Sequence, residues 1–432
     1  MTEATVAHPF SQEAFEAFLA ARTEPDWLTQ LRREAWEDFQ QMDWPGRRDE
    51  EWIRTDIRRF KLDSFTMPSK DAEVADSEAL LAEGVELGGW SAPGCRFDLD
   101  DKWSAKGVVF GSLDELVNDH GELIQKYLLN RAVHSKLDRF AALHAACWHG
   151  GHFLYVPKGV VVDQPLHALS TMTDGGVDMG HILVILEEGA EATVLSESQS
   201  VNEQAGGMHC GAIELFVAPG AHLRFVNLQN WGNKVWHFAH QKGIVSKDAS
   251  LQWTIAAMGS RLAKVNQHVA LDGEGATSQV NGVMFTEGKQ HLSYHTLQHH
   301  EAAHCRSDFL YKAALQDTSR TVWRGMIKVD KDAQKTDGYQ RNDNLLLSNT
   351  ARADSIPGLE IEADDVRCTH GSTSGRVDDE LIFYAQNRGF TRHEAIRMIV
   401  TGFFQQVFDR ITIESVREAL GLAIARRVRD YE

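Results

Sequence analysis

A thiol and an imidazole lie two residues apart near the C-terminal end of the sequence, at Cys368 and His370. If Val366 to His370 forms a strand, the two side chains project from the same face, because side chains alternate along a strand. Thiolate and imidazole are soft ligands suited to iron or an iron–sulfur cluster. Two ligands do not complete a coordination sphere, so the others must come from elsewhere in this chain or from another chain. A buried structural thiol is the alternative role for Cys368.

A second group of metal-ligating residue types runs from His291 to Cys305. Its histidines are His291, His295, His299, His300 and His304. On a helix, the first three would share one face, as in a zinc site. The neighbouring Tyr294 and Thr296 favour a strand, on which residues four apart are separated by about 13 Å. That separation is too large for one metal ion, so we expect these histidines to line a face of a sheet.

The sequence lacks the phosphate-binding and hydrolytic motifs of common enzymes. The segment Gly371-Ser-Thr-Ser-Gly375-Arg376 has glycines and hydroxyls but does not match the P-loop pattern. Neither a nucleophile elbow nor a zinc-protease motif is present. We therefore expect that the chain does not hydrolyse ATP itself. A glycosidase with paired carboxylates stays open, because acidic residues are plentiful and many β-solenoids act on polysaccharides.

The composition limits the classes of partner. The 432 residues carry 44 basic and 62 acidic side chains, a formal net charge of −18. This charge argues against binding to nucleic acid or to an anionic membrane, since both need a basic surface. The five cysteines are scattered without a C-x-x-C pair, so no disulfide framework is expected. With no leader pattern and no run of about 18 apolar residues, we predict a cytoplasmic protein without a membrane span.

Alternating apolar and polar residues, interrupted by Gly, Asp and Asn, predict many strands between Ala145 and Val377. Within this region, turn-like triplets end at Ala190, Ala221, Ala249 and Ala276, which are 31, 28 and 27 residues apart. Two and four residues further on come the pairs Ala192/Val194, Leu223/Phe225, Leu251/Trp253 and Ser278/Val280, of which the first three are apolar. A period of about 28 residues fits one coil of a β-solenoid. A β-sandwich with similar turns fits the same pattern, so the periodicity leaves both architectures open.

Helices are predicted on the N-terminal side of the strand region. The first is Gln12 to Arg22, capped by Ser11. The second is Glu24 to Met42, which Pro45-Gly46 ends. A further helix is predicted from Ser112 to Leu129.

More helices are predicted on the C-terminal side. They are Asp379 to Arg388, capped by Asp378 and ended by Gly389, then a helix opened by a capping box of Thr391 and Glu394, and a last helix from Ile413 to Asp430, capped by Thr412. The middle helix carries Ile396, Val400, Phe403 and Phe404 along one side. This apolar side either packs on the solenoid or contacts a partner.

The segment Asp364 to Gly389 closely resembles the C-terminal signature of the SufB/SufD family, the β-helical subunits of the SUF iron–sulfur cluster assembly machinery. Three further segments resemble the same family, namely 142–159, 304–312 and 337–347. Trp44 to Trp52 resembles the N-terminal motif of the SufD branch. Where SufB-type chains carry a cysteine, this chain has Asn342, so the resemblance favours the SufD branch.

The resemblance implies a mainly β fold, a right-handed parallel β-helix over residues 131–377. It implies an N-terminal helical or mixed domain at 1–130 and a C-terminal helical domain at 378–432. It also implies that the C-terminal helices dock a SufC-like ATPase, with Ile396, Val400, Phe403 and Phe404 as the docking residues. The β-helix would then pair with a SufB-like subunit.

The resemblance also implies a role for the thiol and imidazole pair. His370 matches the histidine of the SufD branch that is implicated in cluster assembly, so it would be the metal ligand, and Cys368 is the second cluster-binding candidate. Iron or an iron–sulfur cluster would be held transiently and shared with the SufB-like subunit. The chain itself would be a non-catalytic scaffold. The alternatives are a β-helix enzyme acting on carbohydrate and a SufD-like homodimer formed without a SufB-like partner.

Overall fold

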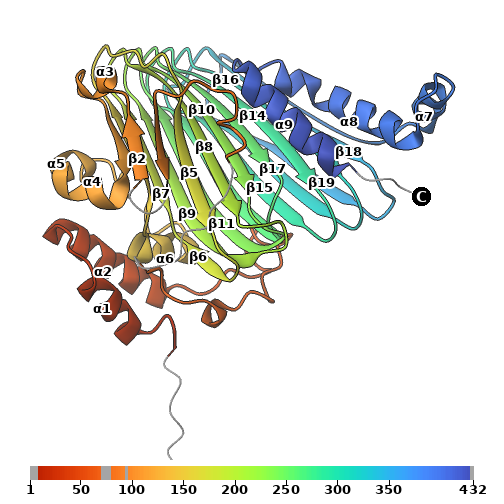
Figure 1. Cartoon of the computed structure of the whole chain (residues 1–432). Coiled ribbons are helices and arrows are strands. Elements are labelled where there is room, and N and C mark those ends of the chain that lie inside the picture. Colours follow the sequence, from red (N-terminus) through yellow and green to blue (C-terminus); the bar gives the residue numbers. More distant parts are fainter. Residues whose placement is uncertain (1–7, 70–78, 93–95, 429–432) are drawn as a thin grey trace, which may run out of the picture.

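The computed structural model describes residues 8–69, 79–92 and 96–428. Its centre is a stack of β-strands that coils from the N-terminal to the C-terminal side of the molecule (Figure 1). Helices α1 (Gln12–Ala20) and α2 (Asp26–Gln41) lie at the beginning of this stack. The first seven residues and Cys95 lie outside the described residues. So does Asp430, at which the last helix is predicted to end.

Two sheets of mostly parallel strands form the stack. One contains, in spatial order, β2 (Arg96–Leu99), β1 (Gly89–Ala92), β5 (Leu166–Met172), β8 (Glu191–Ser200), β10 (His222–Asn230), β12 (Ser250–Ala257), β14 (Thr277–Thr286), β16 (Arg306–Leu315), β18 (Thr336–Leu346) and β20 (Val366–Arg376). We call this the even sheet. The odd sheet contains β19 (Arg352–Ile361), β17 (Arg320–Val329), β15 (His291–His300), β13 (Leu262–Leu271), β11 (Lys234–Val245), β9 (Gly206–Val217), β7 (His181–Leu186), β4 (Gly151–Val156) and β3 (Val109–Ser112), with β6 (Gly176–Asp178) beside β9.

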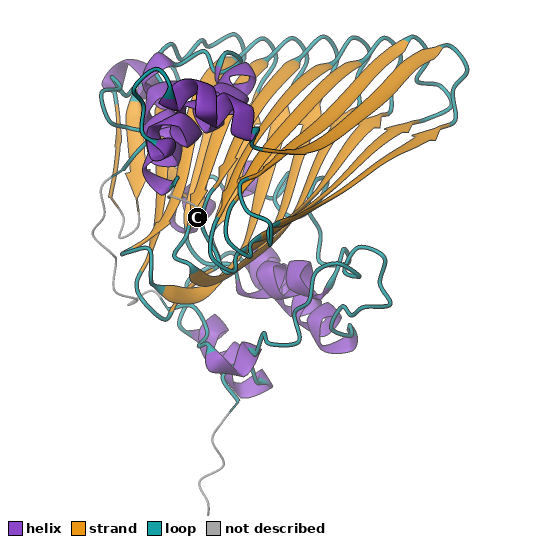
Figure 2. Cartoon of the chain, turned by 90° about the vertical axis from the view of Figure 1, so that its right-hand side faces the viewer, coloured by secondary structure: helices purple, strands orange, loops and turns teal. Residues whose placement is uncertain are grey.

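From β7 onward, successive strands alternate between the two sheets, so each pair of strands makes one coil. Figure 2 shows the two layers of strands joined by a regular series of turns. A β-sandwich does not have this connectivity. The parallel β-solenoid is therefore confirmed, and the sandwich alternative is wrong.

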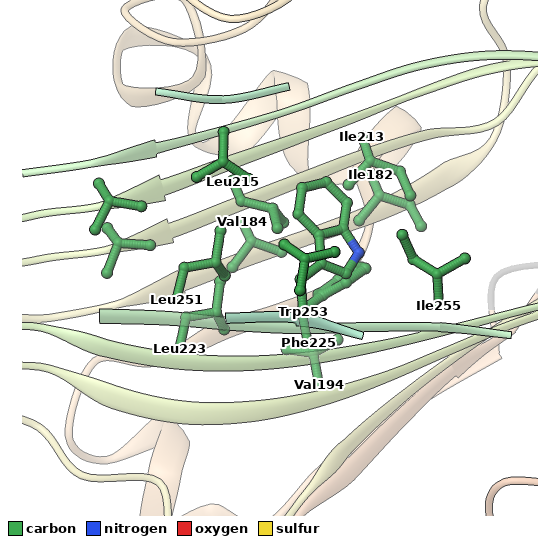
Figure 3. Close-up of a cluster of buried hydrophobic side chains, with 14 of the residues drawn as sticks. Ile182, Val184, Val194, Ile213, Leu215, Leu223, Phe225, Leu251, Trp253 and Ile255 are labelled. Carbon is green, nitrogen blue, oxygen red and sulfur yellow. The ribbon is translucent and has the colours of Figure 1, made fainter. Parts of the chain in front are cut away.

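The sequence repeat corresponds to side chains stacked between coils. Val194 is aligned with Phe225, Phe225 with Trp253, and Trp253 with Val280 on adjacent parallel strands. Each of these side chains is at most 1% exposed. Figure 3 shows the first three with the facing side chains of the odd sheet, including Ile182, Val184, Ile213 and Leu215. The repeat period is therefore the length of one coil, and the shared face of each strand forms the core.

The turns before these strands explain the residues that precede each repeat alanine. Gly189, Gly220 and Gly275 have φ angles of 67°, 67° and 76°, and Asp248 has a φ of 55°. This left-handed conformation is accessible to glycine without a steric cost and is tolerated by aspartate. The triplet Lys247-Asp248-Ala249 therefore forms the same kind of turn as the glycine-containing triplets.

The N-terminal helices differ in part from the prediction. Ser11 caps α1 as expected, accepting a hydrogen bond from the backbone of Ala14. The single helix predicted over Ser112 to Leu129 is wrong, because the chain bends at His120 (φ −117°) before Gly121. The bend separates two short helices, α4 (Leu113–Asp119) and α5 (Gly121–Ile124). The remaining short elements here are η1 (Leu62–Ser64) and α3 (Asp101–Ser104).

A helix that the sequence patterns did not indicate precedes the first long strands. It is α6 (Arg139–Cys147), capped by the Asp138 side chain. Eight of its residues are buried on both sides of the helix, between α2 and the odd sheet. A helix buried all round has no amphipathic period to detect. The strand region therefore begins after Cys147 and not at Ala145.

The C-terminal helices are α7 (Asp379–Gln386), α8 (Arg392–Phe408) and α9 (Glu414–Arg427). Asp378 caps α7, and Thr391 with Glu394 forms the expected capping box of α8. Ile413 rather than Thr412 precedes α9 and makes no side-chain cap. Helices α8 and α9 cover the outer face of the even sheet (Figure 1). None of the helices in the described residues is long and apolar enough to cross a lipid bilayer.

Candidate functional site

The last coil of the solenoid has no strand on its outer side. Within the described residues, β19 pairs only with β17, and β20 pairs only with β18. Each of these edge strands is ten or more residues long. A long edge leaves a row of backbone N–H and C=O groups free to pair with another strand. This end of the solenoid is therefore a ready surface for another protein chain.

The apolar interior is also uncovered at this end. Leu359 and Ile361 of β19 are aligned with Ile327 and Val329 of β17. Ile327 and Val329 are fully buried, whereas Leu359 and Ile361 are 38% and 40% exposed. The same face of the sheet is therefore buried in one coil and open in the next.

Cys368 lies on β20 next to this open end, and the predicted strand from Val366 to His370 is confirmed. Its partner in the register is Gly338 of β18. A β-carbon added to Gly338 would lie 3.2 Å from the Cys368 sulfur, so the thiol packs into the space that the glycine leaves. Partial burial beside Ile327 and Val366 raises the pKa of the thiol above its ordinary value of 9.0. The protonated thiol is therefore favoured in the isolated chain, as expected for a packed structural cysteine.

His370 occupies a more open position on the same strand. It is exposed, and its partner in the register is the fully buried Gln340. Gln340 donates hydrogen bonds to the carbonyls of Gly325 and Gly358, at 3.3 Å and 3.0 Å. In the described part of the chain, no group of three His, Cys, Asp or Glu side chains is arranged to hold a metal ion. Cys368 and His370 alone therefore do not form a metal site within the described residues, and both lie at the open end of the solenoid.

Most of the side chains predicted to dock a partner on α8 are buried within this chain. Ile396, Val400 and Phe404 are at most 1% exposed and pack in one cluster with the outer face of the even sheet. Phe403 is partly buried beneath the Lys312 ammonium, 4.7 Å from the ring centroid. These residues therefore pack on the solenoid, which is one of the two roles expected for this side of the helix. They are not an open surface in this structure.

Other apolar side chains of the C-terminal helices are exposed. Leu381, Phe383 and Tyr384 of α7 are 53%, 65% and 58% exposed, and Met398 of α8 is 53% exposed. Figure 1 shows α7 projecting beyond the strands at the C-terminal side. Clustered exposed apolar side chains mark interaction sites. The apolar composition of α7 was visible in the sequence, but its position away from the sheet was not.

The histidine-rich segment is a strand, as predicted. His291, His295 and His299 share the outer face of β15, and His300 faces the interior, where it bonds to the Ser307 hydroxyl at 2.8 Å. His299 lies between Glu301 and Asp330, each 2.9 Å away. Burial opposes protonation of His299, but these two carboxylates outweigh it and raise its pKa.

Comparison with known proteins gives two family matches along this chain. Residues 169–403 match the core domain of the SufBD proteins of the SUF system for FeS cluster assembly. Residues 98–168 match the SufBD protein N-terminal region. The chain is also similar to iron–sulfur cluster assembly SufBD family proteins of Staphylococcus saprophyticus and Staphylococcus aureus. Each is 25% identical over 415 residues, which covers 91% of this chain and 88% of the relative.

Proposed function

We infer the function of this chain from the family to which it belongs, the SufBD family of iron–sulfur cluster assembly proteins. We propose that it is the SufD-like subunit of a cytoplasmic scaffold complex that also contains a SufB-like subunit and a SufC-like ATPase. In this complex it would support iron entry and cluster assembly and would catalyse no reaction itself. The absence of a P-loop from the sequence fits an ATPase located on another subunit.

The observation that carries the proposal is the uncovered last coil beside His370. We expect the SufB-like subunit to continue the sheets along β19 and β20 and to cover Leu359 and Ile361. His370 would then lie at the subunit interface, where its imidazole supplies one ligand and the SufB-like subunit supplies others. Iron or the growing cluster is the cargo of this site.

The C-terminal helices are the proposed docking segment for the ATPase, with a revised set of contact residues. Because Ile396, Val400 and Phe404 are buried, the contacts would instead involve the exposed side chains of α7, above all Phe383 and Tyr384. Of the four residues predicted from the sequence to dock the ATPase, Phe403 alone is only partly buried.

Neither alternative function draws comparable support. A carbohydrate-active enzyme is not favoured by the family match, which is to a cluster assembly system. A homodimer would use the same free edges and the same apolar end, so it competes directly with the SufB-like subunit for one surface. Sedimentation velocity of the purified chain separates these cases, because a tight homodimer would resist exchange with the SufB-like subunit.

Co-expression with SufB-like and SufC-like chains tests the proposal. We expect a stable ternary complex that gains the visible absorbance of an iron–sulfur cluster. Leu359→Asp should abolish capture of the SufB-like chain, because it places a charge in the apolar end. Leu422→Asp is the matched control, since Leu422 is 56% exposed on α9. Equal capture by both variants would contradict the proposed interface.

A further inference from the structure

A groove lies on the outer face of the odd sheet. It has a volume of about 640 Å³ and is bordered by β11, β13, β15, β17, the segment 132–138 and, at one end, Glu360 of β19. The assembly function proposed above does not use this groove. Two sequence features that the function also leaves unexplained each contribute one residue to it, namely His295 from the histidines of β15 and Glu51 from the Trp44 to Trp52 motif.

The N-terminal motif reaches the groove through one residue. Glu51 lines it, and the neighbouring Glu50 forms an ion pair with Arg324 of β17 at 2.7 Å. A few residues later, the Thr55 hydroxyl donates a buried hydrogen bond of 2.9 Å to the Ser293 hydroxyl of β15. These contacts fix the motif to the sheet, so the groove is a built feature of the fold and not a gap between loosely packed segments.

A buried lysine lies directly behind the groove. Lys264 of β13 is only 2% exposed, and its ammonium donates to the Asn266 side-chain oxygen at 2.8 Å and lies 5.4 Å from the Trp52 ring centroid. Among the described residues, no carboxylate lies within ion-pair distance of it. Burial lowers the pKa of Lys264 to about 7, against the opposing effect of Glu51 and Asp138. An uncompensated buried ammonium is costly unless an anion approaches it.

Four histidines and two lysines line the groove itself, and the argument rests on His268, His295 and Lys242. His268 and Lys242 are neighbours on adjacent strands, and His295 lies between Asn266 and Arg324. His268 Nε2 and His295 Nδ1 are buried without a hydrogen-bond partner. Burial lowers the pKa of these rings to about 3 and about 2, so both are neutral. Each neutral ring carries one N–H group, so each can donate one hydrogen bond to a ligand.

Of the three acidic side chains that line the groove, Glu51, Asp138 and Glu360, the last two are engaged by partners. Glu360 pairs with Lys328 at 3.1 Å. Asp138 contacts His240 at 3.1 Å and also caps α6 through the backbone of Ala141. Within the described residues, Lys242 has no such carboxylate partner. Apart from Glu51 and the buried, unpartnered Gln241 side-chain oxygen, the free polar groups of the groove are donors and positive charge, although the whole chain carries −18. This balance disfavours a metal cation and favours an anion.

We propose that this groove binds a small organic oxoanion. Its anionic group would contact Lys242, His268 and His295, with Lys264 strengthening the positive potential from behind. Leu297 and Met326 supply an apolar surface for the organic part of the ligand. A phosphate ester and a polycarboxylate offer the same oxoanion chemistry to these donors. The groove reaches the edge strand β19 only through Glu360, and its proposed ligand contacts lie on β11, β13 and β15, so this inference does not depend on the proposed function.

Isothermal titration calorimetry tests the inference. The full-length chain is titrated with sodium pyrophosphate and, separately, with sodium citrate, at matched ionic strength. We expect saturable binding of at least one of them, and the better binder identifies the oxoanion as phosphate or carboxylate. Lys242→Gln should weaken that binding at least about tenfold, the loss expected for one charge-assisted hydrogen bond. Lys247→Gln is the matched control, because Lys247 lies in a turn of the solenoid and not in the groove.

Two results would overturn the inference. One is the absence of binding by both anions, and the other is equal binding by the Lys242 and Lys247 variants. His295→Gln provides a second variant that removes an imidazole donor without altering the charge, and its folding is checked by circular dichroism. A His370→Ala chain should bind the anion normally, so failure of the groove and failure of the assembly function give different results.

Discussion

Lowering the pH from about 8 to about 5.5 should destabilise this protein, because the solenoid buries neutral histidines. His152 of β4 and His300 of β15 are 5% and 0% exposed. Burial, reinforced by the nearby His167 and His299 respectively, lowers both pKa values from 6.5 to about 4. The unfolded chain therefore binds protons in this pH range that the folded chain does not bind, and stability must fall as the pH falls.

The size of the effect follows from these pKa values. At about pH 5.5, a histidine with a pKa of about 6.5 in the unfolded chain and about 4 in the folded chain destabilises the fold by about 1.4 kcal/mol relative to about pH 8. The two histidines together contribute roughly 3 kcal/mol. His268, His291 and His295, whose pKa values burial also lowers, add to the effect in the same direction. Carboxylates with ordinary pKa values titrate mainly below this window. His299, whose pKa is raised, acts in the opposite direction.

Urea unfolding at the two pH values, followed by circular dichroism, measures this difference in the free energy of unfolding. The variant His300→Gln keeps a polar side chain next to the Ser307 hydroxyl but removes one titrating group. Its pH dependence should therefore be smaller than that of the unaltered chain by about 1.4 kcal/mol. A pH dependence that is unchanged in this variant, or a chain equally stable at both pH values, would refute the reasoning.

Three further predictions follow from the packing. Phe404→Ala should lower the free energy of unfolding by about 3–5 kcal/mol, because Phe404 is fully buried where α8 packs on the even sheet. A loss below about 1 kcal/mol in urea unfolding would contradict this burial. Phe383→Asp should leave stability unchanged but abolish capture of the SufC-like ATPase in a pull-down, and retained capture would exclude the α7 surface. Gly282→Ala should destabilise by about 1–3 kcal/mol, because the added carbon would meet the Tyr311 ring at 2.1 Å; an unchanged melting temperature would show that the ring moves aside.

The periodic parts of the fold were predictable because their cause is local. A strand of a solenoid must place its apolar side chains on one face and must turn at fixed intervals. The repeat at Ala190, Ala221, Ala249 and Ala276 records both requirements. The left-handed turn at Asp248 shows why glycine is not essential at that position.

The parts that sequence reasoning missed depend on contacts between distant segments. The spacing of Ile396, Val400 and Phe404 correctly indicated an apolar helix face, but the same spacing serves a core and a docking surface equally. Only the position of α8 on the even sheet decides between them. Likewise, the contact between Thr55 and Ser293 holds the N-terminal segment on the odd sheet across 238 residues of sequence, and no local pattern encodes that contact.

The position of Cys368 and His370 was predicted well, whereas their difference in exposure was not. Period-2 alternation placed both side chains on one face of β20. The glycine opposite Cys368 and the buried glutamine opposite His370 lie on β18, and they decide that the thiol packs while the imidazole stays open. The register of a neighbouring strand is therefore the missing information.

The iron content of the assembled complex tests the central claim most directly. We expect the complex containing His370→Ala to form normally but to hold much less iron, measured per complex by inductively coupled plasma mass spectrometry, than the unaltered complex. His222→Ala is the matched control, because His222 is an exposed histidine on β10, away from the last coil. Loss of iron in the His370 variant alone is the result predicted here. Equal iron in both variants would contradict a role for this end of the solenoid in cluster assembly.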